Sequence, residues 1–195
     1  ADPPRSCEPW LPAVRYGLGY TWRDRELRSV LLVSAVVAML GTSYQALMPA
    51  LARDTLQVGA WGLGLLLTSV GVGAVAGAVF SGTPWVANHP QRTLGVLASC
   101  TGLSLLALAY APNLAAALAM ATLLGFCSIG YLVVGNATVQ LKTPADLMGR
   151  VMGQWVVVNA GTMPVGALAL GALAEVAGLP ASLGLAGIAC TLAGL

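Results

Sequence analysis

Charge is scarce in this chain of 195 residues. Acidic and basic residues together make up 8% of the sequence, whereas 57% is hydrophobic and the mean hydropathy is +0.82. Soluble domains carry about 25% charged residues, which they need on their outer face, so the composition excludes a water-soluble globule and indicates an integral membrane protein. The net charge of +2 is also too small, and too thinly spread, to indicate a nucleic-acid partner.

Cysteine and histidine are also rare. The four cysteines, Cys7, Cys100, Cys127 and Cys190, include no C-x-x-C pair, so neither a disulfide framework nor a metal site follows. His89 is the only histidine, and it falls in a loop where we expect a surface imidazole in preference to a proton carrier. The chain has no G-x-S-x-G, H-E-x-x-H or G-x-x-x-x-G-K-[ST] motif and no paired intramembrane aspartates. We therefore expect neither an enzyme nor a bound cofactor or metal.

The longest uncharged stretch runs for 49 residues from Thr93 to Leu141, and a Pro112-Asn113 turn divides it near its middle. A hydrocarbon core about 30 Å thick needs roughly 20 apolar residues per helix, so the stretch predicts two spanning helices joined by a hairpin. Charges and turn residues divide the rest of the chain similarly, which predicts an all-α polytopic transmembrane bundle over residues 29 to 195. The expected helices are residues 29 to 52, 60 to 82, 93 to 111, 114 to 141, 151 to 174 and 181 to 195.

Basic residues divide unevenly between the two sets of loops. Residues 1 to 28, 83 to 92 and 142 to 150 hold eight of them, and the opposite set holds only Arg53. Because lysine and arginine favour the cytoplasmic side, we expect a plasma-membrane protein whose N-terminus faces the cytoplasm. The eight are Arg5, Arg15, Arg23, Arg25, Arg28, Arg92, Lys142 and Arg150.

The two ends of the chain carry further expectations. Residues 1 to 28 are expected to form a cytoplasmic linker, and within them residues 10 to 28 alternate apolar residues with arginines. That pattern is typical of an amphipathic helix at the membrane interface, although a solvated linker remains the alternative. The chain starts at Ala1, and its last apolar segment of about 15 residues, roughly 22 Å long, is short for a span. We expect a longer parent protein in which the sixth helix continues beyond Leu195.

Glycine is abundant inside the expected spans. Gly73-x-x-x-Gly77 in the second span is a small-x-x-x-small pair, which predicts close contact with a neighbouring helix. In the fifth span Gly161, Gly166 and Gly171 recur at intervals of five, and with Pro164 they predict a helix that bends and slides. High glycine content is also ordinary in membrane helices, so this alternative stays open.

Four segments of the chain carry a family resemblance, and their order and spacing agree with one another. They are Gly17–Arg28, Leu47–Asp54 with Gly62–Leu66, Pro144–Gly153, and Pro164–Glu175. They resemble the C-terminal six-helix half of a major facilitator superfamily transporter, in the branch containing the enterobactin exporter and macrolide efflux proteins. Two features depart from the pattern: Met148 stands where it usually has Arg, and Asn88, His89 and Pro90 replace the acidic residue and basic cluster of the superfamily's gating loop.

The resemblance implies two six-helix bundles with a substrate site between them, near the middle of the membrane. It implies a secondary transporter that works by alternating access, with efflux of a small amphipathic organic compound and proton coupling as the expected activity. The partners it implies are that substrate, the lipid bilayer and the N-terminal six-helix half of the same protein. A non-transporting membrane subunit or scaffold is the alternative, and a channel is a weaker third because no ring of charge is visible.

The resemblance also suggests which side chains do this work. The first, second, fourth and fifth spans would line the cavity, so polar side chains at depth on them are candidates for substrate contact. An amide or phenol in hydrocarbon needs a partner, so an interhelical hydrogen bond is the alternative role for each. The candidates are Tyr44, Gln45, Tyr131, Asn136 and Asn159, with Gln140 nearer the cytoplasmic end.

Three pairs of residues are candidates for gating. Arg53 and Asp54 lie at the outer interface, where simple solvation is the competing role, while Asp146 and Arg150 could pair across the last cytoplasmic connection. Pro164 and Gly166 lie where the fifth span is expected to bend. No acid lies deep in a span, since Glu175 is near the outer end of the fifth, so we expect the proton-coupling group in the N-terminal half.

Overall fold

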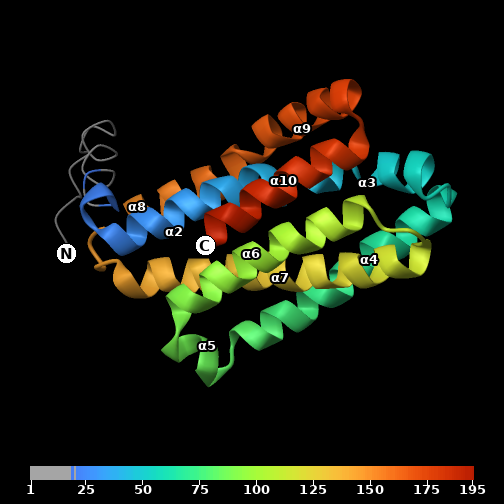
Figure 1. Cartoon of the computed structure of the whole chain (residues 1–195). Helices are drawn as coiled ribbons and strands as arrows, with labels where there is room; N and C mark the ends of the chain where they lie inside the picture. The colour runs from blue at the N-terminus through green and yellow to red at the C-terminus, as the bar shows by residue number, and fades with distance from the viewer. Residues whose placement is uncertain (1–18, 20) are drawn as a thin grey trace, which may run out of the picture.

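The computed structural model describes Gly19 and residues 21–195. The expected linker and most of the expected interfacial helix, with Arg5 and Arg15, lie outside the described residues. Within the described part every regular element is a helix, and the long helices run side by side along one common direction (Figure 1). The predicted all-α membrane bundle is confirmed.

Five helical stretches are long and apolar enough to cross a membrane, and a shorter apolar helix, α10 (Leu179–Gly194), follows them. Three of the five are single α-helices, and a short connecting helix, α5 (Pro84–Asn88), lies between the first two of these. The three are α4 (Gly59–Ser81), α6 (Pro90–Ala109) and α7 (Leu114–Lys142). Their ends lie within a few residues of the predicted ones, because hydropathy and turn residues fix them locally.

The first and fifth spans are not continuous α-helices, unlike the single helices that the sequence predicts. The first consists of α2 (Arg25–Val36), the π-helical turn η1 (Val37–Gly41), the 3₁₀ turn η2 (Ser43–Ala46), α3 (Met48–Ala50) and a second π turn, η3 (Leu51–Thr55). The fifth consists of α8 (Met148–Val156), the π turn η4 (Val157–Gly161) and α9 (Met163–Ala177). Both interruptions lie near the middle of their spans.

Side-chain caps fix where two of the spans begin. The Asp24 carboxylate accepts hydrogen bonds from the backbone N–H groups of Glu26 and Leu27 at 2.9 and 3.1 Å, so the first span begins at Arg25, four residues before the predicted start. The Asn113 side chain accepts from Ala116 N at 2.9 Å and starts α7 just after the predicted hairpin. Gly178, with a φ of +86°, forms the turn between α9 and α10.

Helices α4 and α7 pack with their backbones in close approach. A Cβ atom added at Gly73 or Gly77 of α4 would overlap the carbonyl oxygens of Thr122 or Phe126 on α7. Gly125 of α7 lies equally close to the Val70 carbonyl in the opposite direction. The close contact that the Gly73-x-x-x-Gly77 pattern predicts is therefore confirmed, and it leaves no room for a side chain at the seam.

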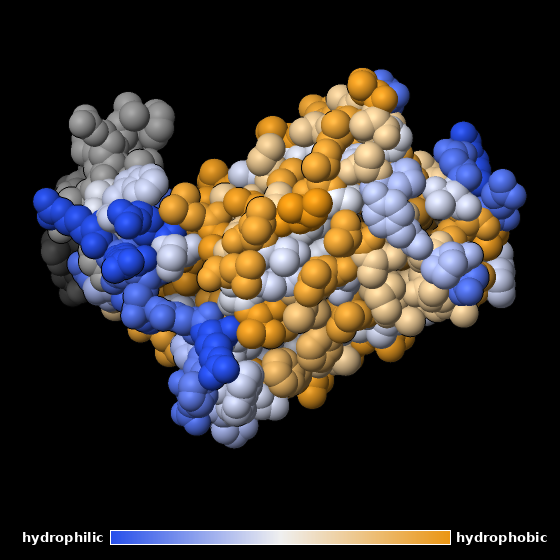
Figure 2. Space-filling view, in the orientation of Figure 1, coloured by the Kyte–Doolittle hydropathy of each residue, from blue (hydrophilic) through white to orange (hydrophobic). Residues whose placement is uncertain are grey.

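The surface is apolar in the middle and hydrophilic at both ends (Figure 2). The start of α2, the start of α6 and the α7–α8 connection meet at one end, which gathers the described members of the basic set (Figure 1). Burial differs sharply between the spans: the first, third and fourth are 50 to 56% buried, but α4 is 17% and the fifth span 11% buried. These last two spans therefore present long apolar faces outward.

We predict that Gly77→Ala destabilises the protein by about 2 kcal/mol, because the new methyl group would overlap the Phe126 carbonyl and force α4 and α7 apart. The matched control is Gly71→Ala on the exposed face of the same helix, where nothing lies within 4 Å of the new atom. Thermal unfolding of the detergent-purified full-length protein measures both variants. Equal melting temperatures would contradict the close approach.

Candidate functional site

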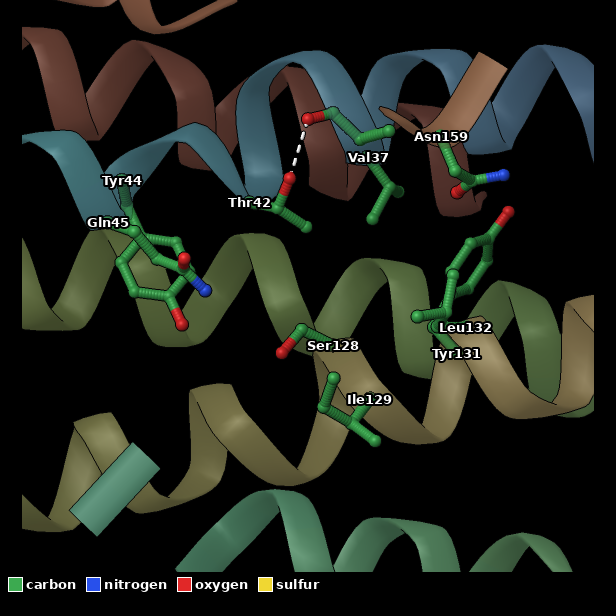
Figure 3. Close-up of a pocket in the computed structure, with 10 residues that line it drawn as sticks. Val37, Thr42, Tyr44, Gln45, Ser128, Ile129, Tyr131, Leu132 and Asn159 are labelled. Atoms are coloured by element: carbon green, nitrogen blue, oxygen red, sulfur yellow. Dashed lines mark hydrogen bonds between the residues drawn. The ribbon is translucent and has the colours of Figure 1, made fainter. Parts of the chain in front are cut away.

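A small pocket lies between the first, fourth and fifth spans, at mid-height in the bundle (Figure 3). Ser128, the middle residue of α7, marks its depth. The cavity volume is about 50 Å³, enough for one or two water-sized groups. The residues that line it are Val37, Ala38, Thr42, Tyr44, Gln45, Ser128, Ile129, Tyr131, Leu132 and Asn159.

The pocket gathers four of the five predicted substrate contacts from three separate spans. Tyr44 and Gln45 come from η2, Tyr131 from α7 and Asn159 from η4. The fifth, Asn136, lies on α7 beyond the pocket, and its side-chain oxygen accepts a 2.6 Å hydrogen bond from the Gln140 amide. Contact of any of these residues with a substrate stays a prediction.

Tyr44 and Gln45 are neighbours in the chain but differ in their exposure. Tyr44 is only 2% exposed, whereas the Gln45 side chain is exposed at the rim. Figure 3 shows the Tyr44 hydroxyl next to the Gln45 amide, on the side of the pocket that faces Ser128. Both side chains come from the 3₁₀ turn η2, and both line the pocket.

Tyr131 makes an interhelical contact in addition to lining the pocket. Its hydroxyl lies 2.9 Å from the Ser34 hydroxyl and 3.5 Å from the Val30 carbonyl, both on α2. The ring faces the pocket while the polar end ties α7 to α2. The interhelical hydrogen bond that the sequence leaves open as the alternative role is thus formed at this residue.

The two π turns on the pocket's wall share a sequence pattern that the sequence-based predictions missed. Val37 to Thr42 and Val157 to Thr162 both read V-x-x-x-G-T. In each, the threonine after the π turn donates its hydroxyl to the carbonyl four residues earlier, Thr42 to Ala38 at 2.7 Å and Thr162 to Val158 at 2.6 Å. The repeat was a visible signal, and π turns of this kind are frequent at functional sites.

A serine and a glycine join the two π turns. Ser43 Oγ lies 2.6 Å from the Met39 carbonyl oxygen in η1 and 3.1 Å from that of Met163, the first residue of α9, and its hydroxyl hydrogen is shared between them. Gly166 packs against the same Met39 carbonyl so closely that a Cβ atom there would overlap it. The first and fifth spans are therefore in direct contact where each departs from regular α-helix.

The predicted gating residues lie at four places. Arg53 and Asp54 form a 2.9 Å ion pair on the exposed surface of η3, where the carboxylate raises the pKa of the guanidinium. Because both side chains are in water, this pair contributes little to stability. Asp146 is exposed in the α7–α8 turn and Arg150 lies in the first turn of α8. Pro164 is the second residue of α9 and is exposed.

One ion pair at the basic end was not predicted. Lys142, the last residue of α7, pairs with Glu26 in the first turn of α2. Charges at these helix ends are expected on general grounds, but their pairing depends on α2 and α7 lying side by side. No local sequence signal could identify it.

Five helical stretches long and apolar enough to cross a membrane, with a shorter apolar helix beside them, define a multi-pass membrane protein. The chain belongs to the transmembrane secretion effector family of the major facilitator superfamily, which matches residues 4–195. The family resemblance read from the sequence is confirmed.

Curated relatives include the enterobactin exporters EntS of Salmonella choleraesuis, Salmonella typhi and Salmonella typhimurium. Each is 30% identical to this chain over 169 residues. The similarity covers 85% of this chain and 40% of each relative, so the chain spans less than half the length of the relatives it matches.

We predict that Tyr131→Phe and Ser34→Ala each destabilise the protein by about 1 kcal/mol, because each removes one partner of a buried hydrogen bond. The double variant should lose little more stability than either single variant, because the same hydrogen bond is removed in all three. Thermal unfolding of all three measures the coupling, and Tyr110→Phe, at a residue that is 65% exposed, is the control. Strictly additive losses would contradict the contact.

Proposed function

We propose that this chain forms the second six-helix half of a proton-driven secondary exporter that moves a small amphipathic organic compound by alternating access. The observation that carries the proposal is the uncharged pocket at mid-height, lined by both polar and apolar side chains, between two spans that Ser43 joins beside their π turns. Export as the direction is supported by the relatives, which bear the name enterobactin exporter.

The size of the pocket supports a second wall contributed by another part of the protein. Pockets for organic ligands measure about 300 to 1,000 Å³, far more than the 50 Å³ or so found here. Gln45 and Leu132 are exposed at its rim, so the pocket opens outward between its helices. The weakly buried apolar faces of α4 and the fifth span offer a surface on which the N-terminal half would pack, with lipid covering the remainder.

The charge distribution supports the proposed orientation and coupling. The described basic residues, apart from Arg53, belong to the end formed by the start of α2 and the α7–α8 connection, which we place in the cytoplasm of a plasma-membrane protein. Between Ser29 and Leu141 the only acid is Asp54, and it is exposed in η3. We therefore place the proton-coupling group in the N-terminal half.

The proposed orientation in the membrane also assigns each candidate gate to one of its two sides. Asp146 and Arg150, with the Lys142–Glu26 ion pair beside them, would close the cytoplasmic end, and Arg53 and Asp54 would act at the outer end. Pro164 and Gly166 would let the fifth span bend where it contacts η1.

We predict that Gln45→Ala lowers efflux about five- to tenfold with expression preserved, because it removes the exposed amide at the rim of the pocket. The assay measures export of a dye and macrolide panel from cells that express the full-length protein, with an uncoupler as the control for the proton gradient. Gln91→Ala, at an exposed position in the first turn of α6, is the matched variant. Unchanged efflux in Gln45→Ala would remove Gln45 from the substrate site.

We predict that Ser43→Ala slows export severalfold, because it breaks the shared hydrogen bond that makes the two π turns bend together. Ser182→Ala is the matched control: its hydroxyl also donates to a carbonyl of α9, that of Leu170 at 2.8 Å, but away from the π turns. Both variants should lose about 1 kcal/mol of stability, so thermal unfolding alone does not separate them. Equal export by the two variants would refute the coupling.

A further inference from the structure

The lining of the pocket has no charged group with which to balance a charged ligand. None of the described residues around it is Asp, Glu, Lys, Arg or His. An ion that entered would lose its water without gaining a counter-charge, which is costly in a low-dielectric site. The part of a ligand that enters must therefore be neutral and must find its partners among hydroxyls and amides.

Two of the pocket's hydroxyls have already donated their only hydrogen. Thr42 donates to the Ala38 carbonyl at 2.7 Å, and Ser128 donates to the Gly125 carbonyl at 3.3 Å. A hydroxyl has one donor hydrogen and two acceptor lone pairs, so both oxygens can only accept further hydrogen bonds. The Tyr131 hydroxyl is engaged with Ser34, whereas the Tyr44 hydroxyl, on η2 beside Gln45, is a donor that the pocket retains.

Asn159 adds a third acceptor. Its Nδ2 atom donates to the Trp155 carbonyl oxygen at 2.9 Å. Because a carbonyl can only accept, this bond fixes the orientation of the amide and turns Oδ1 the other way. Figure 3 shows this oxygen on the side of Val37 and Thr42, and the nitrogen on the side of the Tyr131 hydroxyl. The amide keeps its second N–H as a donor, so the wall formed by η1, η4 and the middle of α7 has more acceptors than donors. Tyr44 and Gln45, on η2, supply the other donors of the pocket.

We propose that this wall binds a neutral hydrogen-bond donor of the cargo, an alcohol, phenol or N–H group, and discriminates against the corresponding ether, ester or carboxylate. The cavity volume of about 50 Å³ suits one such group and not the whole molecule. The inference rests on the proposed function and adds to it the chemical class of the group that this half recognises. A site built to bond a donor rejects the analogue that lacks it, since its buried acceptors are then left unpaired.

The test compares cargo pairs that differ only in a donor hydrogen. Erythromycin is paired with clarithromycin, in which one hydroxyl is methylated, and neutral phenolic dyes are paired with their O-methyl ethers. Uncoupler-sensitive export of each compound is measured in cells that express the full-length protein, and the readout is the ratio of the rate for the donor form to the rate for the methylated form. This ratio is independent of expression level.

We expect at least one pair to show a ratio of about ten in the unmodified protein, and we expect Thr42→Val and Asn159→Leu each to bring that ratio close to one. The matched control is Thr162→Val, which removes the same kind of hydroxyl-to-carbonyl bond in the second V-x-x-x-G-T turn, outside the pocket. Thr162→Val should leave the ratio unchanged even where it slows export.

The outcomes separate the two proposals. Ratios near one for every exported pair, or a high ratio that neither Thr42→Val nor Asn159→Leu lowers, would overturn the inference while the exporter assignment stands. A ratio that falls equally in Thr162→Val would assign the effect to the π turns and overturn it as well. Absence of export for every compound, from protein shown to be folded in the membrane, would overturn the proposed function, and the inference would fall with it.

Discussion

The structure depends on one constraint: inside a bilayer every peptide N–H and C=O group must find its partner within the protein. A continuous α-helix meets this requirement by itself, and α4, α6 and α7 do so. The first and fifth spans break the regular pattern at η1 and η4, and there hydroxyl groups bond the backbone carbonyls. Thr42, Ser43 and Thr162 supply those hydroxyls, and the same kind of bond also occurs within the continuous helices, as from Thr101 to Leu97 and from Thr138 to Val134.

The same constraint shapes the pocket. A threonine that donates to a carbonyl of its own helix keeps only lone pairs to offer, and so does a serine in the same position. Hydroxyls that bond the backbone of their own helix therefore give the neighbouring space more acceptors than donors. Tyr131 and Asn159 also bond atoms of their own bundle before any ligand is present. The polar character of the site is in this way partly a by-product of pairing polar side chains in an apolar medium.

Most of the fold could be predicted from the sequence because its signals are local. Length, hydropathy and the Pro112-Asn113 turn identify the spans, and Gly73-x-x-x-Gly77 identifies a real backbone seam. The π turns could not be predicted in this way, since one extra residue in a turn leaves the hydropathy of a span unchanged. The Lys142–Glu26 pair and the Ser34–Tyr131 bond join residues far apart in the chain, and only the packing of α2 against α7 brings them together.

The candidate site likewise contains residues that the sequence predicts and residues that it does not. Choosing polar residues at depth was enough to find Tyr44, Gln45, Tyr131 and Asn159, because an unpaired amide or phenol is too costly to leave facing lipid. Depth alone could not separate them from Asn136, whose partner Gln140 lies one turn further along α7. Depth could not identify Ser43 either, because a serine can donate its hydrogen bond to a carbonyl of its own helix and gives no hydropathy signal. Yet Ser43 is the residue that bonds both bent spans, so the least conspicuous polar group in the sequence has the most consequential position in the structure.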